Sequence, residues 1–183
     1  VGGDCRLSDD FNVASGASRS LNITGNLTID GGTISMSTTG STIGTINVTG
    51  DVALTGGTIT ENGGSGLFVF NNAGVQTIST GSTVTNTINY TVSSGTTLQM
   101  AASGTTVIGG GTFTLSAGGT LGVTSDDGIS TSGGTGNIQT TGRTYTAGSN
   151  LIYNGNASQI AGSGLANTTK ANVKINNPGN TVT

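Results

Sequence analysis

Apolar and polar positions alternate in short paired blocks along this chain. In the segment FTLSAGGTLGV (113–123), apolar residues recur two apart on both sides of a small polar turn at 116–120. Residues two apart share one face of an extended strand. The segment therefore predicts two short strands joined by a corner.

The same pattern returns at irregular intervals. Further copies begin at Phe11, Leu27, Val52 and Tyr90, so the spacing between successive starts is uneven and is widest between Val52 and Tyr90. Glycine pairs between the strands supply the positive φ that tight corners need. An irregular period of roughly 20 to 25 residues is typical of a β-solenoid, and about eight coils are expected.

We therefore predict an all-β fold in which residues 1–183 form one single-stranded β-solenoid, or parallel β-helix. A β-sandwich is the alternative, because it also contains short strands separated by frequent turns. Few Asn-Gly hairpin signals lie between alternating strands, with Asn154-Gly155 as an exception, and this favours the solenoid.

Composition supports a folded β protein with essentially no α-helix. Glycine contributes 34 residues, and threonine, serine, valine and asparagine, which are mediocre helix formers, fill much of the rest. Glycine does not recur at every third position and there is one proline, which excludes collagen. Regularly spaced Val, Ile and Leu provide the side chains of a core.

Charge excludes two classes of partner. The formal net charge is −3 and the five Lys and Arg residues are scattered, whereas a nucleic-acid site needs cations gathered on one face. No apolar run approaches the roughly 20 residues that span a bilayer. We therefore expect neither nucleic-acid binding nor membrane insertion.

Residue types also limit the chemistry. The chain contains no histidine, which excludes Ser-His-Asp and Cys-His sites and histidine-ligated zinc. Adjacent acids occur at Asp9-Asp10 and Asp126-Asp127, but neighbours on a strand face opposite sides, so we interpret them as solvated turn residues. Cys5 is the one cysteine. We predict no catalytic residue, no metal and no cofactor.

Two groups of apolar residues are candidates for contacts outside the chain. The run Leu67–Phe70 is apolar without a break, so Phe68 and Phe70 either cover a seam within the molecule or contact a glycan or partner. Val173, Ile175 and Val182 belong to a final strand pattern that is interrupted. We expect these three to take part in self-association.

Pairs of threonines separated by one residue suggest a different function. Regular outward threonine ranks on a solenoid resemble those of ice-binding proteins, which gives one alternative function. The pairs are unevenly spaced along the chain and fall at Thr58/Thr60, Thr85/Thr87, Thr112/Thr114, Thr144/Thr146 and Thr181/Thr183.

From about Gly111 onward the chain resembles the β-strand repeat regions of large secreted, adhesin-like surface proteins of Bacteroidetes. The shared elements are a Gly-Ile turn, a Gly-Asn-Ile-Gln strand, a Tyr-Asn-Gly corner, a glutamine, Gly-x-Gly-Leu and an Ile-Asn-Asn strand. Here they fall on Gly128-Ile129, Gly136–Gln139, Tyr153–Gly155, Gln159, Gly162–Leu165 and Ile175–Asn177. The earlier LFVFNNAGVQTI, with Gln76, is similar to another part of the pattern. Ala166 departs from it, because proline often follows the leucine.

The resemblance implies export, commonly by type IX secretion, and an extracellular or bacterial cell-surface location. It also implies a non-enzymatic structural role as an adhesin-like stalk or a filament, with the chain as a segment of a longer protein or a filament subunit. The expected partners are further copies stacked end to end or adjacent repeats of the same chain, with surface glycans as a further possibility. A carbohydrate-binding or carbohydrate-active β-helix, using Phe68, Phe70, Tyr145 and Tyr153, is the other alternative.

Overall fold

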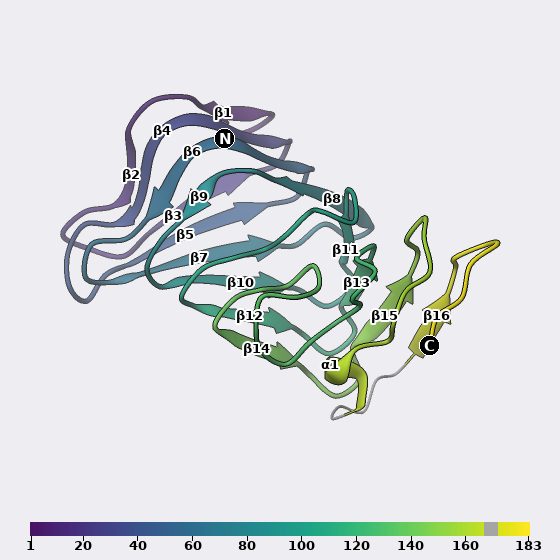
Figure 1. Ribbon diagram of the computed structural model, residues 1–183. Coiled ribbons are helices and arrows are strands. Elements are labelled where there is room, and N and C mark those ends of the chain that lie inside the picture. Colours follow the sequence, from purple (N-terminus) through teal and green to yellow (C-terminus); the bar gives the residue numbers. More distant parts are fainter. Residues whose placement is uncertain (167–171) are drawn as a thin grey trace.

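The chain winds as a parallel β-solenoid of about seven turns, close to the eight predicted (Figure 1). The computed structural model describes residues 1–166 and 172–183. Among these residues every strand pairing is parallel. This confirms the solenoid, because a sandwich would pair its strands in antiparallel fashion.

The larger sheet takes one strand from every turn and contains ten strands within the described residues. Its continuous path is β1 (Cys5–Leu7), β4 (Leu27–Ser37), β6 (Val52–Thr60), β8 (Val75–Thr80), β11 (Thr97–Met100), β13 (Thr120–Val123), β15 (Asn150–Tyr153) and β16 (Asn172–Ile175). Two further strands, β2 (Phe11–Ala14) and β9 (Thr83–Val84), pair with β4 and β6.

The smaller sheet forms another wall of the same coil. Within the described residues its six strands are β3 (Arg19–Ile23), β5 (Ile43–Val48), β7 (Ser65–Phe70), β10 (Ile88–Val92), β12 (Thr112–Leu115) and β14 (Gly142–Tyr145). The helix α1 (Ser163–Ala166) follows β15 and is the one helix of the described chain, as the composition predicts. The strand-corner-strand segment at 113–123 is confirmed as β12 and β13.

Glycine pairs bend the long strands so that each serves two walls. β1 pairs with the first part of β4 and β2 with its second part, on either side of Gly31 and Gly32. Gly32 has a φ of 61° and its counterpart one turn later, Gly57, has a φ of 69°. A Cβ atom on Gly57 would lie 2.5 Å from the carbonyl oxygen of Gly31. These corners therefore need glycine both for backbone conformation and for space.

Turn length varies, and this explains the uneven spacing of the predicted starts. Leu27 pairs with Val52 and Thr120 pairs with Asn150, so the second of these turns is the longer. The predicted starts did not all lie on one wall. Phe11 pairs with Ile34 rather than with Leu27, and Tyr90 lies in the smaller sheet while Val52 lies in the larger.

One inward position is repeated in every rung of the larger sheet. The strand registers align one residue from each rung into an inner column: Cys5, Leu27, Val52, Ile78, Met100, Val123, Tyr153 and Ile175. The side chains from Leu27 to Tyr153 in this column are buried. The hydrophobic core is therefore a set of stacked columns.

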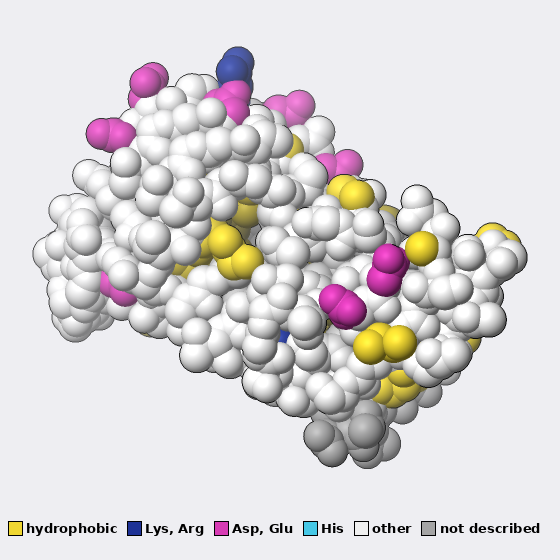
Figure 2. Space-filling model, viewed as in Figure 1, with side chains coloured by type: hydrophobic (Ala, Val, Ile, Leu, Met, Phe, Trp, Pro, Cys, Tyr) yellow, Lys and Arg dark blue, Asp and Glu magenta, His cyan; other side chains and the backbone are white. Residues whose placement is uncertain are grey.

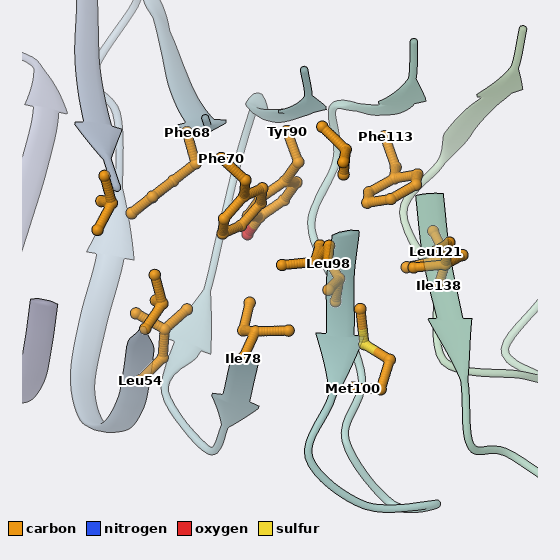
Figure 3. Packing of buried hydrophobic residues seen from close by; sticks show 14 of the residues in the cluster. Leu54, Phe68, Phe70, Ile78, Tyr90, Leu98, Met100, Phe113, Leu121 and Ile138 are labelled. Atoms are coloured by element: carbon orange, nitrogen blue, oxygen red, sulfur yellow. The ribbon is translucent and has the colours of Figure 1, made fainter. Parts of the chain in front are cut away.

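Aromatic side chains fill the middle of the core, where they face the aliphatic side chains of the larger sheet (Figure 3). The rings of Phe68 and Tyr90 are stacked with centroids 5.7 Å apart, and Phe113 lies next in the same column. Offset aromatic stacking adds about 0.5–1.5 kcal/mol per pair to the burial of apolar area.

The corner glycines give a first prediction. Gly57→Ala should lower the free energy of unfolding by about 1–3 kcal/mol, since alanine is strained at positive φ and its Cβ would meet the backbone of the preceding turn. Gly104→Ala is the matched control, because a Cβ there meets no atom within 4 Å. Urea denaturation measures both variants, and equal stability of the two would contradict this account of the corner.

Candidate functional site

Phe68 and Phe70, for which the sequence left open an internal seam or a contact with a glycan or partner, lie inside the molecule. Phe68 and Phe70 are 0% and 1% exposed. They alternate along β7 with Leu67 and Val69, which are half-buried on its outer side. The prediction of an external contact by Phe68 and Phe70 is therefore wrong, and the physical reason is that this apolar strand directs its largest residues to the core. Tyr145 and Tyr153 are buried as well.

The residues expected to self-associate lie in the last turn but not in one strand. Val173 and Ile175 are in β16 and are 44% and 55% exposed. Val182 is partly buried and forms a separate parallel bridge with Gln159, so the predicted final strand is two separate segments. Whether these residues contact another copy stays a prediction.

Acidic side chains do not converge on a reactive centre. Asp9, Asp10, Asp126 and Asp127 are exposed in turns, as expected. Glu61 is buried, and its carboxylate accepts hydrogen bonds from the backbone N–H of Gly63 and Thr87 at 2.7 and 3.1 Å. Within residues 1–166 and 172–183, no group of three Asp, Glu or Cys side chains could hold a metal ion.

Among the described residues, the one ion pair links two successive turns of the coil. The guanidinium of Arg6 lies 2.6 Å from the carboxylate of Asp30, at the bend of β4. Hydrogen bonds from Arg6 and then from Ser8 hold the pKa of Asp30 below its ordinary value. The carboxylate is thus kept ionised and joins the first two turns.

Buried side-chain amides form a set of sites that the sequence did not predict. The Nε2 atom of Gln76 donates to the carbonyls of Val48 and Gly50, at 3.1 and 2.5 Å. Gln159 Nε2 donates in the same way to Val123 and Ser125, at 3.0 and 2.9 Å. Each amide thus bonds two carbonyls of an earlier turn, and for Val48, Val123 and Ser125 it is a second donor beside a backbone N–H. Both glutamines are among the residues that carry the family resemblance, and this was the one signal in the sequence that could have singled them out.

Asn137, which precedes the isolated parallel bridge between Ile138 and Val107, also donates to carbonyls of an earlier turn and adds a second contact. Its Nδ2 atom donates to the carbonyl of Thr105 at 2.8 Å and to that of Ser103 at 3.5 Å. Its Oδ1 atom accepts the N–H groups of Thr124 and Ser125, both at 2.9 Å. The side chain is fully buried, so this network replaces water at a corner.

The hydroxyl of each tyrosine donates a hydrogen bond to a backbone carbonyl. Tyr90 donates to Ile108 at 3.0 Å, Tyr145 to Ser130 at 3.2 Å and Tyr153 to Ala161 at 2.5 Å. Burial raises the pKa of all three phenols above the ordinary value and raises the pKa of Tyr153 to about 12. These hydroxyls therefore fasten loops to the core in their neutral form.

An outer column runs along the larger sheet beside the inner one. It begins with a ladder in which each side-chain oxygen accepts the N–H group of the next rung, Asp4 from Asn26, Asn26 from Asp51 and Asp51 from Thr77, at 2.7 to 2.8 Å. The strand registers continue this column through Gln99, Gly122, Ile152 and Lys174. The polar side chains outside the coil thus complete the bonding between turns.

The threonine pairs do not form one rank. Thr58 and Thr60 lie in β6, in register with Thr33 and Ser35 of β4. The pairs Thr112/Thr114 and Thr144/Thr146 lie on and beside the smaller sheet, and Asn86 with a φ of 62° separates Thr85 from Thr87. The threonine pairs on which the ice-binding alternative depends are therefore divided between walls.

No protein-family model, curated protein or solved structure matches this chain. Among the described residues there is no helix both long enough and apolar enough to cross a lipid bilayer.

The buried amides give a second prediction. Gln159→Leu should destabilise the fold by roughly 1–3 kcal/mol, because it removes the acceptor of the Gly155 N–H and the second donor to the carbonyls of Val123 and Ser125. Gln139→Leu is the control, since Gln139 is half-buried and makes one bond, to Gly136. Urea denaturation compares them, and a neutral Gln159→Leu would show that water can replace the amide.

The tyrosines give a third prediction. Because the pKa of each phenol is raised in the folded state, the stability that it contributes is complete below the unfolded pKa of about 10 and is lost as pH rises beyond it. Phenolate absorbance should therefore not develop near pH 10 in the native protein, and should develop there in urea. A native titration with a midpoint near 10 would contradict the burial of these hydroxyls.

Proposed function

We propose that this chain is a non-enzymatic structural β-solenoid, a rod-like segment of an extracellular bacterial surface adhesin or filament. The observation that carries the proposal is the use of the polar side chains. Glu61, Gln76, Asn137 and Gln159 are buried and bonded to the backbone. Side chains already held in this way are not available as acids, bases or ligands.

The outer surface supports the same role. The ladder from Asp4 to Thr77 and the side-chain bonds of Asn22 to Asn47 and Asn150 to Asn172 all join one turn to the next. Tension along the axis would load many such bonds together. The resemblance to repeat regions of secreted surface proteins is consistent with this role and with export from the cell.

The test combines force and binding measurements. Pulled from its two ends, the single molecule should lengthen in steps that each release one turn, or roughly 75–100 Å of extended chain. A glycan array and polysaccharide hydrolysis assays should give no selective binding and no cleavage.

Selective glycan binding would overturn the proposal in favour of a carbohydrate-binding β-helix. The place to locate such binding is the shallow polar recess lined by Ser103, Thr124 and Asn154. Loss of binding on Asn154→Ala, with unchanged stability, would assign it there.

A further inference from the structure

The two ends of the solenoid differ in charge. Asp4, Asp9 and Asp10 are exposed on the first turn, and acidic side chains gather at the N-terminal end in Figure 2. Beyond Asp127 the sequence has no Asp or Glu and three cations, of which Lys174 lies exposed in β16. The first turn thus carries three exposed carboxylates together with Arg6 and Arg19, whereas the last strand carries one charge, that of Lys174.

The last rung has an incomplete set of neighbours. Within the described residues β16 pairs with β15 alone and ends the path of the larger sheet, so no described strand lies along its other edge. Val173 and Ile175 continue the columns of Leu151 and Tyr153, which are fully buried, yet they are about half exposed. One more rung would bury them and satisfy the edge.

Within residues 1–166 and 172–183, the first rung likewise has a neighbouring rung on one side only. β1 ends the path of the larger sheet on the other side, and it pairs with β4 alone. Cys5 and Leu7 of β1, with Phe11, Val13 and Leu21 of the same turn, are partly buried against the core. A rung placed before β1 would therefore cover apolar surface as well as an open strand edge.

Two columns extend from one end to the other and fix how such rungs would meet. The inner column begins with Cys5 and ends with Ile175. The outer column begins with the carboxylate of Asp4 and ends with the ammonium of Lys174. If a second copy continued both columns, apolar Ile175 would meet Cys5, and Lys174 would meet Asp4.

We propose that β16 of one copy pairs in parallel with β1 of a second copy, head to tail, in the register that places Ile175 beside Cys5 and Lys174 beside Asp4. This inference rests on the proposed structural role and names its partner as the chain itself. The pairing would extend the backbone ladder across the junction, and it joins opposite charges where the columns meet.

Charge also selects between the two registers that keep apolar residues inside. Because the side-chain period of a strand is two, a slip by two residues also directs Val173 and Ile175 inward, over Cys5 and Leu7. That slip places Lys174 beside Arg6, and like charges directly opposite are unfavourable. The register that continues the columns avoids this repulsion.

A disulfide tests the register, with the native Cys5 as one partner. In adjacent rungs about 4.8 Å apart, paired cysteines lie within the Cα separation that a disulfide accepts. Ile175→Cys should therefore form disulfide-linked linear multimers under mild oxidation. Val173→Cys, the matched control, should cross-link much less, and Cys5→Ser should abolish the product. Preferential linkage through Val173→Cys would overturn the register.

Charge reversal tests the association itself by sedimentation velocity. Wild-type protein should form multimers that weaken as salt is added, and Lys174→Glu should weaken association roughly 5- to 30-fold. Asp4→Asn in the same chain should restore part of the loss, since asparagine can accept the Asn26 N–H as Asn26 itself accepts that of Asp51.

A wild-type chain that stays monomeric at high concentration, and that gives no disulfide product with Ile175→Cys, would overturn the head-to-tail inference. The outcome is separate from the test of the proposed function. A monomer that unfolds turn by turn and binds no glycan would still be a structural rod, whereas a glycan-binding multimer would retain the junction and lose the structural role.

Discussion

Hydrogen bonding between successive turns is the constraint on which this structure depends. Parallel strands cannot satisfy their backbone within one turn, so each turn requires the next to accept and donate. The requirement fixes a register, and the register stacks side chains into columns such as that of Leu27, Val52 and Ile78. Residue choice at one position is therefore limited mainly by the residues one turn before and after it.

The strand-corner-strand pattern was sufficient to predict the fold class. Periodicity of two and paired glycines identified β12 and β13 and the bend at Gly31 and Gly32. Pattern alone could not assign a strand to a wall, because both sheets use the same alternation. The interval from Val52 to Tyr90 therefore joined different walls. The same limit applies to Phe68 and Phe70, because an uninterrupted apolar run does not show which of its side chains point into the core.

The buried amides could not be found from composition or periodicity, although Gln76, Asn137 and Gln159 all lie in segments that carry the family resemblance. At the corners the chain leaves the strand ladder, and buried amides donate to carbonyls there, such as that of Gly50. Gln76, Gln159 and Asn137 supply the donors from inside the coil. In a chain rich in Thr, Ser and Asn, composition and periodicity do not distinguish these residues, since their role depends on carbonyls in a distant turn.

The long turn between Thr120 and Asn150 shows where this architecture can vary. Its additional residues lie in the segment 124–138, where the guanidinium of Arg143 donates to the carbonyls of Ser130 and Gly133 and, at 3.0 Å, to that of Thr140. β13 and β15 remain in register on either side. Lengthening one corner thus leaves the rungs undisturbed, so descendants of this gene could acquire new loops, and with them new surface properties, without redesigning the rod.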